Sequence, residues 1–238
     1  MKSAAIAKPL LISFSGIDGA GKSTHIAHLC EAMAAAGCPV EQRAFWDDVV
    51  VLSGLREGVT LKVFKSEKGV GAPGKPVQRR DKNVRSWYLS LVRSAFYLLD
   101  ALHLRRVVAR ARRSGAAVII FDRYIYDELA NLPLNNHAAR AFLRGVAWIS
   151  PRPNLAYVID ANPEEACARK PEYPLEFSRR CRETYLRLAA MLNMVVVPPL
   201  PLTEALREMS SRFQEVAAKH ARGGQAPGQD ASDVGFAA

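Results

Sequence analysis

The residues from Gly16 to Ser23 are the part of the sequence best suited to chemistry. They read Gly-Ile-Asp-Gly-Ala-Gly-Lys-Ser and fit the pattern G-x-x-x-x-G-K-[ST], in which backbone N–H groups surround phosphate oxygens. The glycines leave room for phosphate, Lys22 supplies a cation for the β- and γ-phosphates, and the Ser23 hydroxyl suits Mg²⁺. The segment predicts a nucleotide-binding loop with contacts from Gly16, Asp18, Gly19, Ala20, Gly21, Lys22, Ser23 and Thr24.

A second polar pair, Asp122 and Arg123, follows the apolar run at 116–121. A carboxylate at the end of a buried strand can reach Mg²⁺ directly or through water, and the arginine can make a charge-assisted contact to a second phosphate. A purely structural Asp–Arg pair is the alternative interpretation. Ligands of parallel sheets bind beyond the carboxyl ends of the strands, so we expect this pair and the glycine-rich loop at one edge.

Apolar runs and helical periodicity predict the elements that position these residues. Strands are expected at 9–14, 39–45, 116–121, 154–160 and 194–199, and helices at 23–36, 84–113, 138–149, 163–170, 175–192 and 203–222. Apolar strands without alternation indicate a parallel sheet that is covered on both faces. The expected fold is therefore α/β with three layers, in which helices flank a parallel sheet of about five strands.

Length and composition indicate one globular domain. The chain has 238 residues, of which 49% are hydrophobic and 24% charged, so we expect a single domain over 1–222 and a disordered tail at 223–238. Four cysteines form no C-x-x-C pair, which favours reduced thiols. No apolar stretch reaches membrane-spanning length, so we expect a cytoplasmic protein without a signal peptide or a membrane partner.

The net charge of +10 predicts an anionic partner. Much of the excess lies in an insertion at about 54–83, since nine basic and three acidic residues occur between Arg56 and Arg85. Aromatic residues in and beside this stretch make nucleic-acid binding one interpretation. We favour a solvated basic loop beside an anionic active site, and therefore expect small-molecule partners rather than nucleic acid.

Four segments resemble the thymidylate kinase family of nucleoside monophosphate kinases: "GIDGAGKST", "FDRY", "NLAYVIDANPEEACAR" and "FSRRCRETYLRLA". The 22-residue separation of Asp100 and Asp122 also matches that family. The resemblance covers about 9–200. It implies a P-loop kinase fold with a short lid at about 169–177, ATP and Mg²⁺ as cofactors, and phosphoryl transfer to a nucleoside monophosphate, with dTMP to dTDP as the first candidate. It also implies a homodimer.

The resemblance further implies roles for individual side chains. Asp18 would lie near the 3′-hydroxyl of the acceptor sugar, and Arg123 would hold the acceptor phosphate. Tyr97 takes the position of the aromatic residue that stacks on the base. Lys22, Asp122, Arg123 and Arg169 form the expected catalytic set, with Ser23 and Asp122 as the metal ligands. Arg169, Arg180 and Arg182 match basic positions around the lid, where a solvated basic helix face is the alternative.

Several positions depart from the family pattern. The R-E-P-G segment after the second strand is replaced by "RAFWDDVV", Ala101 occupies the place of the arginine that contacts thymine, and Asn131-Leu132 replaces Y-Q. Loss of buried polar contacts to the base should relax or change base specificity. A kinase for another small acceptor, such as a deoxynucleoside or a phosphorylated metabolite, is therefore an alternative. An ATP-binding regulatory or nucleic-acid-binding protein is a third.

Overall fold

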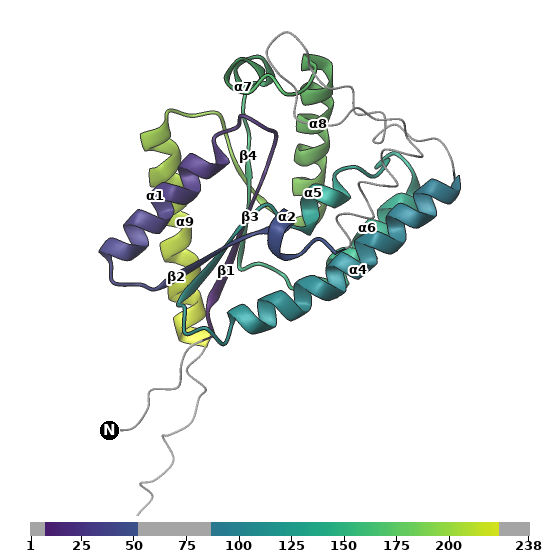
Figure 1. The fold of residues 1–238 in the computed structure, drawn as a ribbon. Helices are drawn as coiled ribbons and strands as arrows, with labels where there is room; N and C mark the ends of the chain where they lie inside the picture. The colour runs from purple at the N-terminus through teal and green to yellow at the C-terminus, as the bar shows by residue number, and fades with distance from the viewer. Residues whose placement is uncertain (1–7, 52–86, 224–238) are drawn as a thin grey trace, which may run out of the picture.

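A five-stranded parallel sheet forms the centre of the molecule (Figure 1). The structure is a computed structural model that describes residues 8–51 and 87–223. The strands, in the order β2-β3-β1-β4-β5, are β1 (Leu10–Ser15), β2 (Val40–Ala44), β3 (Val118–Asp122), β4 (Leu155–Ile159) and β5 (Val195–Val197). The predicted α/β fold with about five parallel strands is confirmed.

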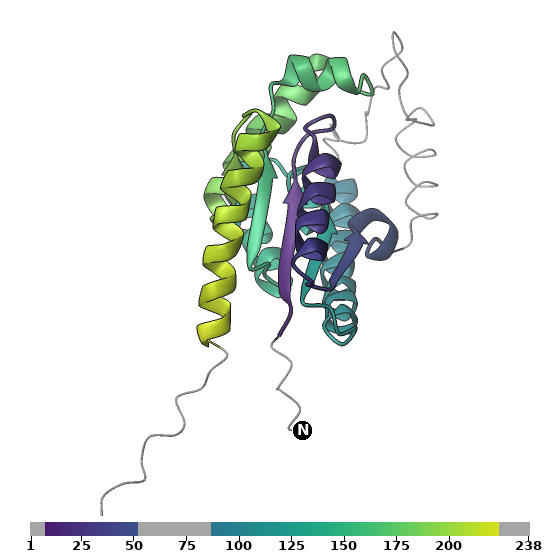
Figure 2. The same cartoon turned by 90° about the vertical axis from the view of Figure 1, so that its left-hand side faces the viewer.

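Helices cover both faces of this sheet. They are α1 (Lys22–Ala35), α2 (Phe45–Asp48), α4 (Trp87–Ala111), α5 (Ile125–Leu129), α6 (His137–Ile149), α7 (Pro163–Arg169), α8 (Leu175–Leu192) and α9 (Leu202–Gly223). Helices α1 and α9 pack together on one face, as Figure 2 shows, whereas α4, α5 and α6 pack together on the other. Within the described residues, no helix combines the length and apolar character needed to cross a membrane.

The core consists of two hydrophobic clusters, one on each face of the sheet. Along β1, Leu10, Ile12 and Phe14 point into the cluster beneath α1 and α9, and Leu11 points into the cluster beneath α4 and α6. This alternation is the two-residue period of a strand. Because both faces are buried, every residue of β1 is buried. The central strand therefore carries the glycine-rich loop on a rigid support.

Two short helices, α2 and α5, were not predicted. The strand expected at 39–45 ends at Ala44, and α2 begins at the next residue. The Ala44 N–H donates to the Asp48 carboxylate of α2 at 2.8 Å. Helix α5 begins after Tyr124, whose N–H donates to Asp127 at 3.1 Å. Helices of four or five residues are too short to show periodicity. The insertion at 54–83 and the tail after residue 223 lie outside the described residues.

Candidate active site

The glycine-rich loop connects β1 to α1 and is held against the neighbouring backbone. Gly16, Gly19 and Gly21 all have positive φ angles, which other residues rarely adopt. A Cβ atom on Gly16 would lie 2.5 Å from the Ile159 carbonyl oxygen, and one on Gly19 would lie 2.3 Å from the Ala166 carbonyl oxygen. Both glycines are therefore required for close packing against the end of β4 and against α7, as well as for the loop conformation.

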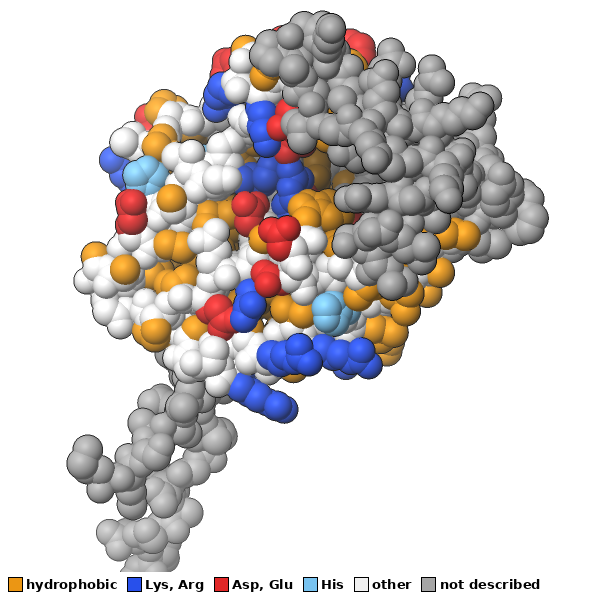
Figure 3. Space-filling model, viewed as in Figure 1, with side chains coloured by type: hydrophobic (Ala, Val, Ile, Leu, Met, Phe, Trp, Pro, Cys, Tyr) orange, Lys and Arg blue, Asp and Glu red, His pale blue; other side chains and the backbone are white. Residues whose placement is uncertain are grey.

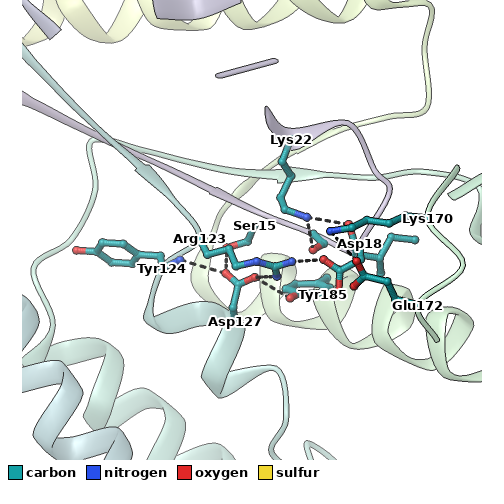
Figure 4. A network of polar contacts seen from close by, with 11 residues as sticks. Ser15, Asp18, Lys22, Arg123, Tyr124, Asp127, Lys170, Glu172 and Tyr185 are labelled. Carbon is teal, nitrogen blue, oxygen red and sulfur yellow. Dashed lines mark hydrogen bonds and ion pairs between the residues drawn. The ribbon is translucent and has the colours of Figure 1, made fainter. Parts of the chain in front are cut away.

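Lys22, the first residue of α1, turns its side chain back into the loop. Its ammonium donates to the carbonyl oxygens of Gly16 at 3.0 Å and Ile17 at 2.8 Å (Figure 4). Burial, reinforced by the nearby charge of Arg123, lowers the pKa of Lys22 to about 8. A phosphate in the loop would favour the charged form again. The loop therefore places a desolvated cation where it can bind a phosphate oxygen.

Arg123 reaches the same loop from the end of β3. Strand register places Asp122 beside Phe14, and the Arg123 N–H donates to the Phe14 carbonyl oxygen at 2.9 Å. Arg123 has a φ of 67°, a left-handed conformation that costs about 1–2 kcal/mol for a residue with a side chain. Its guanidinium pairs with Asp18 of the loop and with Asp127 (Figure 4). The structure thus brings together the two motifs that the sequence predicted as neighbours.

Asp127 is the centre of this polar network and was not predicted from the sequence. Its side chain is only 1% exposed, and it accepts hydrogen bonds from Ser15 Oγ at 2.6 Å and Arg123 Nη1 at 2.9 Å. It also accepts from Tyr185 Oη at 2.8 Å and from the Tyr124 N–H. Although burial lowers the pKa of Arg123, the charges of Asp127 and Asp18 raise it above its ordinary value. Asp127 therefore links β1, β3 and α8 through one buried carboxylate.

Two neighbouring basic residues at the end of α7, the predicted Arg169 and the next residue Lys170, have different surroundings. Arg169 is exposed and donates to the Glu165 carbonyl oxygen at 3.3 Å. Lys170, the next residue, forms an ion pair with Glu172 at 3.0 Å, beside Asp18 in Figure 4. The hydrogen bond to Glu172 raises the pKa of Lys170; the nearby charge of Asp18 adds to this increase and that of Arg123 opposes it. Basic and acidic side chains accordingly meet in a hollow of this face (Figure 3).

The other predicted lid cations lie elsewhere. Arg180 is exposed on α8. Arg182 forms two hydrogen bonds to the Asp160 carboxylate, at 2.6 and 2.7 Å, just after β4. That pair fastens α8 to the end of β4, so Arg182 has a structural partner. Of the predicted lid cations, none contacts the loop residues in the described structure.

The residue predicted to stack on the base, Tyr97, lies on α4. Tyr97 is buried in the cluster that includes Ala101, with 5% of its surface exposed. One turn further, the buried Asp100 accepts a hydrogen bond from the Val51 N–H at 2.9 Å. Asp100 thus joins α4 to the segment after α2. Stacking of a base on Tyr97 stays a prediction.

The residues present fit a magnesium nucleotide. Asp122 ends β3 beside the loop, and the exposed Ser23 lies in the first turn of α1. Among the described residues, no three or more acidic, histidine or cysteine side chains are grouped so that they could hold a metal ion by themselves. Mg²⁺ often binds through one or two protein oxygens together with substrate phosphates, and Ser23 and Asp122 suit that arrangement.

The parallel sheet, the phosphate loop after β1 and the arginine after β3 define a P-loop phosphotransferase. No family model matches the chain, but curated relatives narrow the class. The chain is 31% identical to the thymidylate kinase of Polaromonas sp. over an alignment of 190 residues that covers 74% of this chain and 82% of that protein. The chain therefore belongs to the thymidylate kinase family, and it is a nucleoside monophosphate kinase.

Two further relatives carry similar names. A probable thymidylate kinase of Archaeoglobus fulgidus is 27% identical over an alignment of 209 residues that covers 84% of this chain and 92% of the relative. The thymidylate kinase of Solidesulfovibrio magneticus is 26% identical over an alignment of 225 residues that covers 84% of this chain and 95% of that protein. The resemblance inferred from the sequence motifs is confirmed.

Proposed function

We propose that this protein transfers the γ-phosphate of Mg·ATP to dTMP, giving dTDP and ADP. The observation that supports this most strongly is the guanidinium of Arg123 beside the phosphate loop, paired with the loop residue Asp18. A second anion held by Arg123 would lie next to a triphosphate held by the loop. Relatives named thymidylate kinase make dTMP the first candidate for that anion.

The chemistry follows from charge and position. An oxygen of the acceptor phosphate attacks the γ-phosphorus, and the bond to the β–γ bridging oxygen breaks to release ADP. Lys22 would stabilise the negative charge on the transferred group, and Arg123 would hold the acceptor in line. Mg²⁺ bound by Ser23 and Asp122 would neutralise further charge on the phosphates. Positioning of this kind accounts for most of the catalysis of phosphoryl transfer.

Acceptor binding on Arg123 requires an exchange of partners. Asp127 is almost completely buried, whereas Asp18 keeps 26% of its side chain exposed. We infer that the acceptor phosphate replaces Asp18 on one edge of the guanidinium while Asp127 keeps the other. Asp18 is then released toward the sugar, where the family resemblance places it.

The lid cation is tested by a matched pair of variants. We propose that Lys170 approaches the transferred phosphate, because it already lies beside Asp18, and that Glu172 holds it there before the substrates bind. Lys170→Ala should lower kcat by about 10- to 1,000-fold, in the range of a lost transition-state donor. Arg169→Ala is the control and should change kcat less than threefold. A larger loss of kcat in Arg169→Ala than in Lys170→Ala would instead assign the role of lid cation to Arg169.

The reaction is tested by an acceptor screen. ADP release is measured in a coupled assay with dTMP, dUMP, dCMP, dGMP, dAMP and free nucleosides. We expect turnover that depends on dTMP and is lowered by several orders of magnitude in Lys22→Ala. Absence of acceptor-dependent turnover with every compound would contradict the kinase proposal.

A different acceptor is the second candidate, and Ala101 favours it. Ala101 is fully buried on α4 and has no polar group with which to contact a base. A site without that contact discriminates weakly between bases. Rates for two or more monophosphates within tenfold of each other would support this candidate.

A homodimer and a cytoplasmic location stay proposals. Apolar side chains on the outer surface of α4, namely Val92, Leu98, Leu99 and Leu102, are between 37 and 50% exposed. Figure 3 shows part of this apolar surface along the helix. Light scattering during size-exclusion chromatography would give twice the chain mass for a dimer. The basic insertion lies outside the described residues, and nucleic-acid binding stays the less favoured interpretation of its charge.

A further inference from the structure

A cavity of about 690 Å³ opens at the end of the sheet opposite the phosphate loop. Its walls come from the first residues of β4 and β5, the last turn of α6 and the end of α8. The phosphate loop packs on Ile159 at the far end of β4, whereas Leu155 lines this cavity. The two sites are therefore separated by about 13 Å along the strand, from a rise of about 3.3 Å per residue.

The cavity is positively charged. Arg144 and Arg152 line it, both are exposed, and neither forms an ion pair within the described part of the chain. No aspartate or glutamate is among its described lining residues. Two arginines without a nearby carboxylate attract an anion, and their planar guanidinium groups suit phosphate or carboxylate oxygens.

The cavity also presents aromatic groups. Trp148 lies on α6, one turn after Arg144, and is 75% exposed. Among the large hydrophobic residues that the structure describes, this is the highest exposure. Exposed tryptophan provides a flat surface on which another ring can stack. Aromatic stacking next to two cations favours a ligand that combines a ring with negative charge.

A tyrosine in the cavity wall adds a hydroxyl group to the two arginines and the tryptophan. Tyr126 lines the cavity, and the residue as a whole is only 6% exposed. Burial raises the pKa of Tyr126 to about 12, and the nearby charge of Arg152 partly opposes this increase. The phenol therefore stays protonated at neutral pH and lies close to Arg152. A phenol hydroxyl can donate a hydrogen bond, so this group is suited to bind a ligand oxygen.

We propose that this cavity binds a nucleoside phosphate, with the base on Trp148 and the phosphate between Arg144, Arg152 and the Tyr126 hydroxyl. The volume lies within the range of small-molecule sites, about 300–1,000 Å³. The proposal concerns a site other than the active site and does not depend on which acceptor the enzyme uses. Tyr126 directly precedes Asp127, so an occupant would contact the helix that carries the partner of Arg123.

Tryptophan fluorescence tests the proposal at the site itself. The chain has three tryptophans, so the Trp46→Phe/Trp87→Phe variant leaves Trp148 as the only one. Titration with dTTP should give a saturable change in Trp148 emission. Thymidine, which lacks the anion, and tripolyphosphate, which lacks the ring, should each bind at least tenfold more weakly.

Further variants in the same background assign the signal to this cavity. Arg152→Ala should weaken dTTP binding at least tenfold, the loss of one charge-assisted contact, and Tyr126→Phe should weaken it several-fold. Arg140→Ala, one turn before Arg144 on α6 and outside the cavity lining, is the control and should have no effect. The proposal is overturned if emission shows no saturable change. It is also overturned if the change persists in the Arg144→Ala/Arg152→Ala variant and disappears in Lys22→Ala, because the ligand would then occupy the phosphate loop.

Calorimetry of the chain with all three tryptophans provides a second measurement that does not depend on the folding of the tryptophan variant. dTTP should bind at two sites, one of which is lost in Arg144→Ala/Arg152→Ala and kept in Lys22→Ala. A single site that is abolished by Lys22→Ala would overturn the proposal.

Discussion

Replacing Asp127 with asparagine removes the charge that holds Arg123 and changes little in volume. The carboxylate accepts four hydrogen bonds, two on each oxygen, and is 1% exposed. An asparagine amide keeps one oxygen, so two of the four donors lose their acceptor and face an NH₂ group instead. Arg123 also loses its buried counter-ion.

The expected loss of stability is large. Removal of one partner from a buried ion pair costs about 3–5 kcal/mol, a considerable part of the 5–15 kcal/mol by which domains are typically stable. At about 2–4 °C per kcal/mol for a chain of this size, the melting temperature should fall by about 6–20 °C. Thermal unfolding followed by circular dichroism measures this change.

Kinetics separate positioning from stability. Asp127→Asn should raise KM for the acceptor at least tenfold, because Arg123 is no longer fixed, and should change KM for ATP less than threefold. Glu164→Gln is a matched control, since Glu164 pairs with Arg179 on the surface, where an ion pair contributes at most about 1 kcal/mol. A melting temperature within 2 °C of the unchanged chain, together with an unchanged acceptor KM, would refute the role given to Asp127.

Further predictions concern the loop and the thiols. Gly19→Ala should abolish ATP binding and destabilise the fold, because its Cβ would lie 2.3 Å from the Ala166 carbonyl oxygen. Gly115→Ala is the control, since Gly115 has a similar positive φ but a Cβ there would contact nothing. Calorimetry on both variants therefore separates the effect of the clash from that of backbone strain. The pKa of Lys22 is lowered from 10.5 to about 8, so the unfolded chain binds more protons between pH 8 and 10.5. The contribution of Lys22 to the free energy of unfolding should therefore rise with pH across that window. Denaturant titrations measure it as the difference in free energy of unfolding between the unchanged chain and Lys22→Met. A difference that does not change between pH 8 and 10.5 would contradict the lowered pKa. Cys30, Cys38, Cys167 and Cys181 are free thiols, so a reducing agent should leave the melting temperature unchanged, and a fall of several degrees would show a disulfide.

The sequence predicted the parts of the fold that depend on periodic, apolar segments. The five strands and the long helices appear within a few residues of their predicted bounds, and α8 has the predicted ones. The phosphate loop and the Asp122-Arg123 pair were recognisable because their residue types and spacing follow directly from phosphate chemistry. Parallel pairing of β1 and β3 then places the two motifs together.

Individual side-chain contacts between distant segments could not be predicted, although the meeting of the two motifs could. Asp127 meets Ser15 and Tyr185, which are 112 and 58 residues away, and no local pattern marks such a partner. Lys170 lies beside Asp18, whereas Arg169, the last residue of α7, donates to the Glu165 carbonyl oxygen. The spacing of basic residues in the lid identified the segment and could not identify which side chain faces the loop.

Binding of dTMP and of thymidine to the Arg123→Gln variant tests the central claim most directly. The two ligands differ only in the phosphate, so titration calorimetry on each isolates the contact that Arg123 is proposed to make. We predict that the unchanged chain binds dTMP at least tenfold more tightly than thymidine, and that Arg123→Gln removes this difference while thymidine binds as before. An unchanged preference for dTMP in the variant would contradict the proposal that Arg123 holds the acceptor phosphate beside the loop.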